Sequence, residues 1–311
     1  MPDLILHHYA GSPFAEKMRL ILGFKRMAWQ SVIVPVILPK PDVMALTGGY
    51  RRTPFMQIGA DIYCDTALMC RVIDALQPEP PLYPQATAGV AEIVAQWADA
   101  TLFWAAVPYT MQPAGIVHVL KGATPDTLKA FGADRAAMNP NLRRPTLPDG
   151  AAALHTYLSR LEQMLAGGSA FLLGAQPCIA DFSAAQSIWF VRLAPPIAAV
   201  LDAYPKLVAW YERVNVFGHG RFTKMTSAEA IAVAASGPHA PVVFNAEPGL
   251  APGDAVTVTP TDYAHDPVAG TLVGLSRDEV VVARRDERAG VVHVHFPRIG
   301  FQIKPQQPAS A

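Results

Sequence analysis

The segment from Arg52 to Thr66 constrains the fold of this chain more than any other stretch of its 311 residues. Pro54 stands before a run with strand character, and proline in sheets is confined to strand starts, edges and bulges. Gly59-Ala60-Asp61 then has the composition of a tight turn, and Asp65-Thr66 has side chains suited to a helix N-cap. The segment therefore predicts a β-hairpin that leads directly into a helix.

The same segment predicts a binding site. An X-Pro bond is the peptide bond that most readily becomes cis, so we expect Thr53-Pro54 to turn backbone polar groups outward, where a ligand amide can pair with them. The free N–H groups of a helix that starts at Thr66 favour a carboxylate or another anion. A ligand with both an amide and a carboxylate fits this pattern.

Composition excludes several classes of protein. The formal net charge is zero and no basic stripe occurs, which argues against nucleic acid or an anionic membrane as the main partner. No apolar run approaches the ~18 residues of a membrane span, and the polar start does not resemble a signal peptide, so we expect a cytoplasmic protein. The cysteines lack C-x-x-C spacing, which argues against a disulfide framework, a zinc ribbon or a dithiol motif: Cys64, Cys70 and Cys178.

Residues 1–78 predict a sheet covered by helices. A strand over 3–7 leads into a helix that begins at Ser12-Pro13, followed by a strand over 29–34, a proline-rich loop, the hairpin and a helix over 66–75. This order predicts that the first two strands are parallel across a right-handed crossover. On the first helix, the charged residues are expected on the outer face: Glu16, Lys17 and Arg19.

The rest of the chain predicts two more units after a proline-rich linker. Residues 84–238 carry helical stripes, the first of which is expected to break at Pro108, and they end at Gly237-Pro238. Residues 241–305 have only strand signals and are expected to form a small β-barrel-like domain. Its strands are predicted over 255–258, 271–273, 279–282, 291–296 and 301–303.

These segments together resemble the soluble glutathione transferase superfamily, with an omega- or zeta-like start, over the first three quarters of the chain. The matching pieces are Tyr9 to Lys17, Lys40-Pro41-Asp42, Thr53-Pro54, Asp65-Thr66, and Gly174 with Ile179 to Phe182. The resemblance implies a thioredoxin-like N-terminal domain, an all-helical second domain, a homodimer and glutathione as co-substrate. The β tail lies outside the common pattern.

The resemblance also implies which residues hold glutathione. Asp65 and Thr66 would bind its γ-glutamyl end, the backbone of Thr53 its cysteinyl amide, and Lys40 its glycine carboxylate. A simple solvated lysine is the alternative for Lys40. The implied glutathione contacts are Phe14, Lys40, Thr53, Pro54, Asp65 and Thr66.

Ser12 would be the catalytic residue, because it would stand nearest the sulfur and could stabilise the thiolate. Omega-like members carry cysteine there, whereas this chain has Ser12, with Ala15 where a second dithiol cysteine would stand, so disulfide exchange is disfavoured. A serine that only caps its helix is the alternative. Tyr9 is a competing partner for the thiolate.

The second substrate would be a small hydrophobic electrophile between the two domains. Its pocket is expected to include Tyr9, Phe103, Trp104 and Tyr109, although such aromatic residues also suit a helical core. The resulting hypothesis is a glutathione transferase, with glutathione-dependent isomerisation or dehalogenation as variants. The alternative is a non-catalytic binding protein of the same fold whose β tail recruits a partner.

Other reactive side chains are expected to be structural. Cys64 beside an acid should be a quiet thiol, and Asp181 should cap a helix that Cys178 precedes. His293 and His295 share one strand face, and a metal site there would need a third ligand, for which His265-Asp266 is the candidate segment. The alternation of the strand explains the pair as solvent-facing, so no metal site is expected.

Overall fold

The computed structural model describes residues 3–140 and 146–306. Its N-terminal part has the predicted order, with the first two strands parallel and the hairpin antiparallel. A short helix over 41–47 was not predicted, because Pro41 was read as part of a loop although it stands in the first turn of that helix. The elements are β1 (Leu4–His8), α1 (Pro13–Phe24), β2 (Ala28–Ile33), α2 (Pro41–Thr47), β3 (Phe55–Ile58), β4 (Asp61–Cys64) and α3 (Thr66–Leu76).

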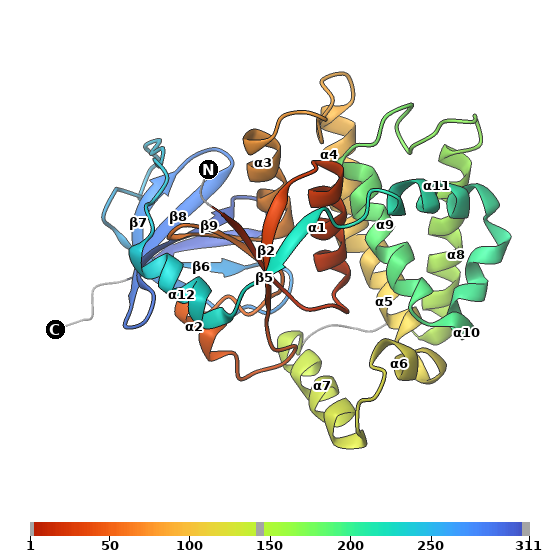
Figure 1. Ribbon diagram of the computed structural model, residues 1–311, viewed down its shortest axis with the longest axis horizontal. Helices are drawn as coiled ribbons and strands as arrows, with labels where there is room; N and C mark the ends of the chain where they lie inside the picture. Colours follow the sequence, from red (N-terminus) through yellow and green to blue (C-terminus); the bar gives the residue numbers. More distant parts are fainter. Residues whose placement is uncertain (1–2, 141–145, 307–311) are drawn as a thin grey trace.

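The helical part follows and lies beside this sheet (Figure 1). The expected break at Pro108 is wrong, because the helix continues to Thr110, and a π-helical segment interrupts the regular turns before it. Its elements are α4 (Ala88–Trp97), η1 (Ala98–Leu102), α5 (Phe103–Thr110), α6 (Pro113–Val119), α7 (Pro125–Met138), α8 (Leu147–Met164), α9 (Ile179–Arg192), α10 (Pro195–Ala198), η2 (Ala199–Ala203) and α11 (Pro205–Asn215).

The C-terminal β region is confirmed as several consecutive strands, but they do not close into a separate barrel. They extend the N-terminal sheet, because β9 pairs in parallel with β4 and gives one ten-stranded sheet of order β10-β6-β7-β8-β9-β4-β3-β1-β2-β5. The remaining elements are β5 (Arg221–Lys224), α12 (Ser227–Ser236), β6 (Ala255–Pro260), β7 (Val268–Leu275), β8 (Glu279–Asp286), β9 (Gly290–Pro297) and β10 (Phe301–Pro305).

Two hydrophobic cores lie on the two sides of this sheet. The first joins α1 and α3 to the helical part, with Trp210 and Phe182 fully buried inside it. The second joins β1 and β2 to α2, α12 and the strands of the tail, with Phe55 and Phe296 at its centre. The tail thus shares a core with the N-terminal part.

Over the described ranges, no helix alone is long and apolar enough to cross a membrane. Only α9 taken together with Pro195–Ala203 passes by length and composition, and this pair is bent by 119°. Nearly all residues of α9 are buried within the protein.

Candidate functional site

Three loops meet at one end of the sheet. In the register of the strands, His7 of β1 pairs with Phe55 of β3, which in turn pairs with Cys64 of β4. The residues just beyond these three positions therefore lie at the same end of the sheet. They are the turn from Tyr9 to Ser12, the Thr53-Pro54 pair with its cis bond, and Asp65-Thr66. The structure thus brings together the segments that the sequence indicated.

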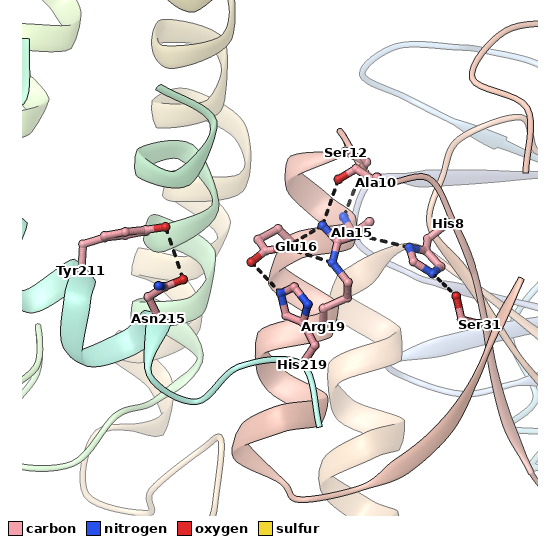
Figure 2. A network of polar contacts seen from close by, with 10 residues as sticks. All are labelled: His8, Ala10, Ser12, Ala15, Glu16, Arg19, Ser31, Tyr211, Asn215 and His219. Carbon is pink, nitrogen blue, oxygen red and sulfur yellow. Dashed lines mark hydrogen bonds and ion pairs between the residues drawn. The ribbon is translucent and has the colours of Figure 1, made fainter. Parts of the chain in front are cut away.

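Ser12 is the N-cap of α1 and is 2% exposed. Its Oγ accepts a hydrogen bond from the backbone N–H of Ala15 at 3.2 Å (Figure 2). Its own N–H donates to the carbonyl of Tyr9 at 3.2 Å. Among the described residues, no acceptor takes the hydroxyl proton of Ser12. This hydroxyl can therefore cap the helix and donate to a ligand at the same time.

A buried charge network holds the loop in front of Ser12 (Figure 2). Arg19 donates to Glu16 at 2.5 and 2.9 Å and to the carbonyl of Ala10 at 3.1 Å, while His219 binds the other oxygen of Glu16 at 2.9 Å. Burial opposes ionisation of Glu16, but His219 and Arg19 outweigh it and lower its pKa. His8, which contacts Arg19 at 3.1 Å, stays neutral because burial and the Arg19 charge lower its pKa to about 3.

The predicted outer face of α1 is therefore wrong for all three charged residues. Glu16 and Arg19 are 2% and 5% exposed, and Lys17 is 1% exposed. The helical periodicity of the sequence placed these residues in solvent, because a local pattern contains no information on distant partners such as Asp99, which pairs with Lys17. The Lys17 Nζ lies 2.6 Å from an Asp99 carboxylate oxygen.

Asp65 and Thr66 form the N-terminus of α3 as predicted. Asp65 has a φ of 74°, which is strained for a residue other than glycine, and its carboxylate accepts from the N–H of Ala67 at 2.9 Å. Thr66 Oγ1 lies 3.3 Å from Lys17 Nζ. The ammonium group of Lys17 therefore lies at the start of this helix, with its charge balanced by Asp99.

Lys40 lies beside the same loop and is buried. Its Nζ donates to the carbonyl of Arg51 at 3.2 Å and to Thr53 Oγ1 at 3.3 Å. Burial, and then the charge of Arg135, lowers the pKa of Lys40 to about 8. Lys40 is thus not a simple solvated lysine, and one of its three donors is left for a ligand beside Thr53.

An aromatic row leads from α1 to the tail. Phe14 contacts Phe103 with ring centroids 4.8 Å apart, Phe103 contacts Trp104 at 5.1 Å, and Trp104 meets Tyr263 edge-on at 5.7 Å. Tyr109, also predicted for the pocket, is partly buried and packs against the first hydrophobic core.

Tyr263 belongs to the loop between β6 and β7, and sequence reasoning missed it. The Arg52 guanidinium lies 3.8 Å from the centroid of the Tyr263 ring, and Arg52 also binds the Asp262 carboxylate and the carbonyl of Tyr263. No local pattern marks this loop, because its partner Arg52 lies more than two hundred positions earlier in the chain. The tail therefore contributes side chains to the end of the sheet where the three N-terminal loops meet.

The positions of the cysteines agree with the expected structural roles of Cys64 and Cys178. All three are buried, and burial raises the pKa of Cys64 well above its usual range and that of Cys178 to about 12. Asp181 accepts hydrogen bonds from Leu172 and Cys178 N–H groups at 2.9 Å and from Trp210 at 2.7 Å, which is a structural role.

The expected solvent-facing pair on β9 is wrong for His295, which is 3% exposed. His265, the third ligand considered, lines a surface hollow with Met138 and Pro140. The structure brings His239 beside His293 instead, with the two rings stacked at 3.8 Å.

Comparison with known proteins gives the following matches. Residues 6–81 match the sequence family described as glutathione S-transferase, N-terminal domain, and residues 144–213 match glutathione S-transferase, C-terminal domain. No curated protein matches the chain. A crystal structure of a GST-like protein from Pseudomonas syringae is 42% identical, with a TM-score of 0.82, and the match covers 98% of this chain and 100% of that one. The region of this chain that matches therefore includes the C-terminal strands.

More distant solved structures share the fold alone. A glutathione S-transferase from Rhodospirillum rubrum F11 is 20% identical over 68% of this chain and 87% of its own, with a TM-score of 0.53. A beta-etherase from Sphingobium sp. strain SYK-6 is 14% identical over 68% of this chain and 95% of its own, with a TM-score of 0.52.

Proposed function

This chain belongs to the glutathione transferase superfamily, and from that premise we propose that it binds glutathione and directs the sulfur of that tripeptide onto a hydrophobic electrophile. The observation that carries the proposal is that Ser12, Thr53-Pro54 and Asp65-Thr66 lie together at one end of the sheet. Each of the three supplies a different kind of contact, and together they match the three parts of the ligand.

Glutathione lies across this end of the sheet, with both of its carboxylates near positive charge. Its γ-glutamyl carboxylate takes the start of α3 at Thr66, with Lys17 beneath, while its amine faces Asp65. The cysteinyl amide pairs with the backbone of Thr53. The glycine carboxylate faces Lys40, which hydrogen bonds already hold beside Thr53.

Ser12 stabilises the thiolate. An ordinary thiol has a pKa of ~8.5, and one pKa unit corresponds to ~1.4 kcal/mol. A hydrogen bond to a charged group contributes roughly 1.5–3 kcal/mol and a helix N-terminus ~0.3–1 kcal/mol, so Ser12 at the start of α1 suffices for a shift of one to two units. Tyr9 is the competing donor. Its carbonyl accepts the N–H of Ser12 in the turn before α1, but Tyr9 itself does not lie at the start of a helix.

The electrophile binds against the aromatic row of Phe14, Phe103, Trp104 and Tyr263. These rings suit a flat or hydrophobic molecule. The sulfur forms a bond to the electrophilic carbon, and either a leaving group departs with its electron pair or the resulting carbanion takes a proton from solvent. Isomerisation and dehalogenation begin with the same addition.

The alternative, a non-catalytic binding protein, rests on one observation. Asp262 and Tyr263 already contact Arg52 beside the proposed glutathione contacts, so the tail can also cover this end of the sheet. In that case the tail would recruit a partner, and the protein would turn over no substrate.

A calorimetric titration with glutathione, followed by turnover assays with several aromatic electrophiles, tests the proposal. We expect one glutathione per chain and formation of thioether product. Cysteinylglycine, which lacks the γ-glutamyl group, is the matched control and should bind far more weakly. Binding without turnover supports the alternative, and no heat with millimolar glutathione contradicts the proposed transferase.

We also propose a homodimer in the cytoplasm, in keeping with the superfamily. Val90 and Ile93 on α4 are 47% and 69% exposed, which suits a covered face. Light scattering coupled to size exclusion should give twice the chain mass, and the mass of a single chain would contradict the dimer.

A further inference from the structure

A cluster of histidines and one aspartate lies where β4 begins. In the pairing of β4 with β9, Asp61 stands directly beside His293, and His295 stands two residues further on the same strand face. The N–H of His293 donates to the carbonyl of Ala60 at 3.1 Å, which fixes β9 against the hairpin turn. The sheet itself therefore sets the distance between Asp61 and His293.

A third segment reaches the same point from the end of α12. Ala60 donates to the carbonyl of Pro238 at 3.1 Å, and the N–H of Ala240 donates to Asp61 Oδ2 at 2.6 Å. A Cβ on Gly237 would lie 2.8 Å from Gly59, so this crossing over the turn needs glycine. Between these two anchors, His239 is held beside Asp61.

The distances suit a metal better than hydrogen bonds. Asp61 Oδ1 lies 3.4 Å from His239 Nδ1 and 3.7 Å from His293 Nδ1, and the three ligand atoms all lie within 4.8 Å of one another. A nitrogen 3.7 Å from an oxygen is not hydrogen-bonded. Ligand atoms ~2.0–2.2 Å from a tetrahedral zinc are, by geometry, ~3.3–3.6 Å apart.

His293 supplies an independent sign of a missing partner. Its Nδ1 is inaccessible to solvent and has no hydrogen-bond partner among residues 3–140 and 146–306. A buried polar atom of this kind is normally satisfied, because leaving it without a partner costs free energy. The rings of His239 and His293 are stacked, with their planes 17° apart and both Nδ1 atoms near Asp61. Because the lone pair of an imidazole lies in the plane of its ring, binding of one ion by both requires the His239 ring to turn out of the stack.

From these observations we propose that Asp61, His239 and His293 bind one divalent transition-metal ion of the zinc class, with water in the fourth position. Aspartate and neutral imidazole are typical ligands of such ions. Outer contacts orient the aspartate: His295 lies 3.1 Å from Asp61 Oδ1 and 2.8 Å from a Glu279 oxygen through its other nitrogen. Such outer hydrogen bonds are a regular part of metal sites.

The site is structural, because it lies away from Ser12 and its partners. Asp61 is at the opposite end of β4 from Asp65, ~13 Å away at ~3.3 Å per residue. The ion would join the hairpin, the segment after α12 and β9. Binding to the folded chain alone would raise the thermal midpoint by roughly 5–10 °C when the metal is at 100 times its Kd.

Titration of the full chain with Co²⁺ and Zn²⁺, after dialysis against a chelator, tests the site. We expect one ion per chain, the intense visible absorption of four-coordinate Co²⁺, and a rise in the thermal midpoint with Zn²⁺. His239→Ala, at a position whose side chain is 29% exposed, should weaken binding by more than the ~10- to 100-fold expected for the outer residue in His295→Gln.

His265→Ala is the matched control, because His265 is an exposed histidine of the same tail that lies outside the cluster. It should bind Co²⁺ as the unmodified chain does. The proposal is overturned if the unmodified chain binds no stoichiometric metal, if Co²⁺ gives only the weak six-coordinate spectrum, or if His239→Ala and His265→Ala lose affinity equally.

Discussion

Ser12 has two duties that substitutions can separate. As an N-cap it satisfies the N–H of Ala15, and in the proposed mechanism it also donates to the thiolate of glutathione. Aspartate caps helices as well as serine does, but its carboxylate repels a thiolate. Helix capping and thiol chemistry therefore respond differently to the same change.

Ser12→Asp should keep the capping hydrogen bond to Ala15 and raise the pKa of bound glutathione, with turnover falling about 10- to 100-fold, the range set by a hydrogen bond to a charged group. Ser12→Thr, which keeps the hydroxyl, is the control and should retain most of the turnover. The pKa is measured from thiolate absorbance as pH varies. If Ser12→Asp turns over like the unmodified chain, Ser12 only caps its helix.

Lys40 gives the site a pH dependence with a defined sign. Because burial, followed by Arg135, lowers its pKa to about 8, the free site loses the ammonium charge as pH rises through 8, while Asp134 opposes this loss. Affinity for S-methylglutathione, which has no thiol to titrate, should be constant below pH 7 and fall above pH 8. Calorimetry at a series of pH values measures it.

Lys40→Arg is the control for that experiment, because arginine stays charged throughout. Its affinity should not fall between pH 7 and 9 beyond the change caused by the amine of the ligand itself. If both proteins follow the same pH curve, Lys40 does not face a carboxylate.

At the scale of elements, the loop between β6 and β7 is the least expected part of the site. It reaches Arg52 and Trp104 from the far end of the chain, and its ring contacts are worth ~0.5–1.5 kcal/mol each. A contribution of that size changes selectivity among electrophiles without deciding whether the protein folds.

Tyr263→Ala should therefore lower kcat/KM for a flat aromatic electrophile about 3- to 10-fold and leave a small aliphatic electrophile nearly unchanged. Steady-state kinetics with both electrophiles measures the ratio. Tyr204→Ala, a tyrosine of the helical part that contacts His155, is the control and should not alter the ratio. Equal losses for both electrophiles would remove Tyr263 from the pocket.

Local signals explain which elements the sequence could predict. The β3–β4 hairpin and α3 were predictable because Pro54, Gly59 and Asp65 act within a few residues of where they stand. Helix α7 was not, because only its last residue, Met138, is buried and it shows no apolar stripe. Strand β5 is wholly exposed, and only its pairing with β2 makes it a strand.

At the scale of the whole molecule, long-range pairing limited the prediction. The loops that carry the proposed glutathione contacts could be predicted because a family motif marks them, whereas the contacts of Asp99, His239 and Tyr263 join distant segments. The strands of the tail were found, but a separate barrel was expected because nothing local in β9 indicates β4 as its neighbour.

Removal of every residue after Gly237 should therefore destabilise the N-terminal part. The deletion uncovers the edge of β4 and half of the second core, including the side of Phe55 that shares it with Phe296. We expect loss of a cooperative unfolding transition by circular dichroism, with recovery when a 238–311 fragment is co-expressed. A truncated chain that unfolds at the original midpoint would show that the tail is only an appendage.

The pairing of β4 with β9 also bears on how the chain is made. Asp61 to Tyr63 leave the ribosome roughly 230 residues before their partners His293 to His295, which at ~5–20 residues per second is a delay of roughly 10–50 s. Through that interval the nascent chain carries a bare strand edge, which is a template for pairing with neighbouring polypeptides. We therefore expect the nascent chain to aggregate more readily before β9 has been synthesised than after it.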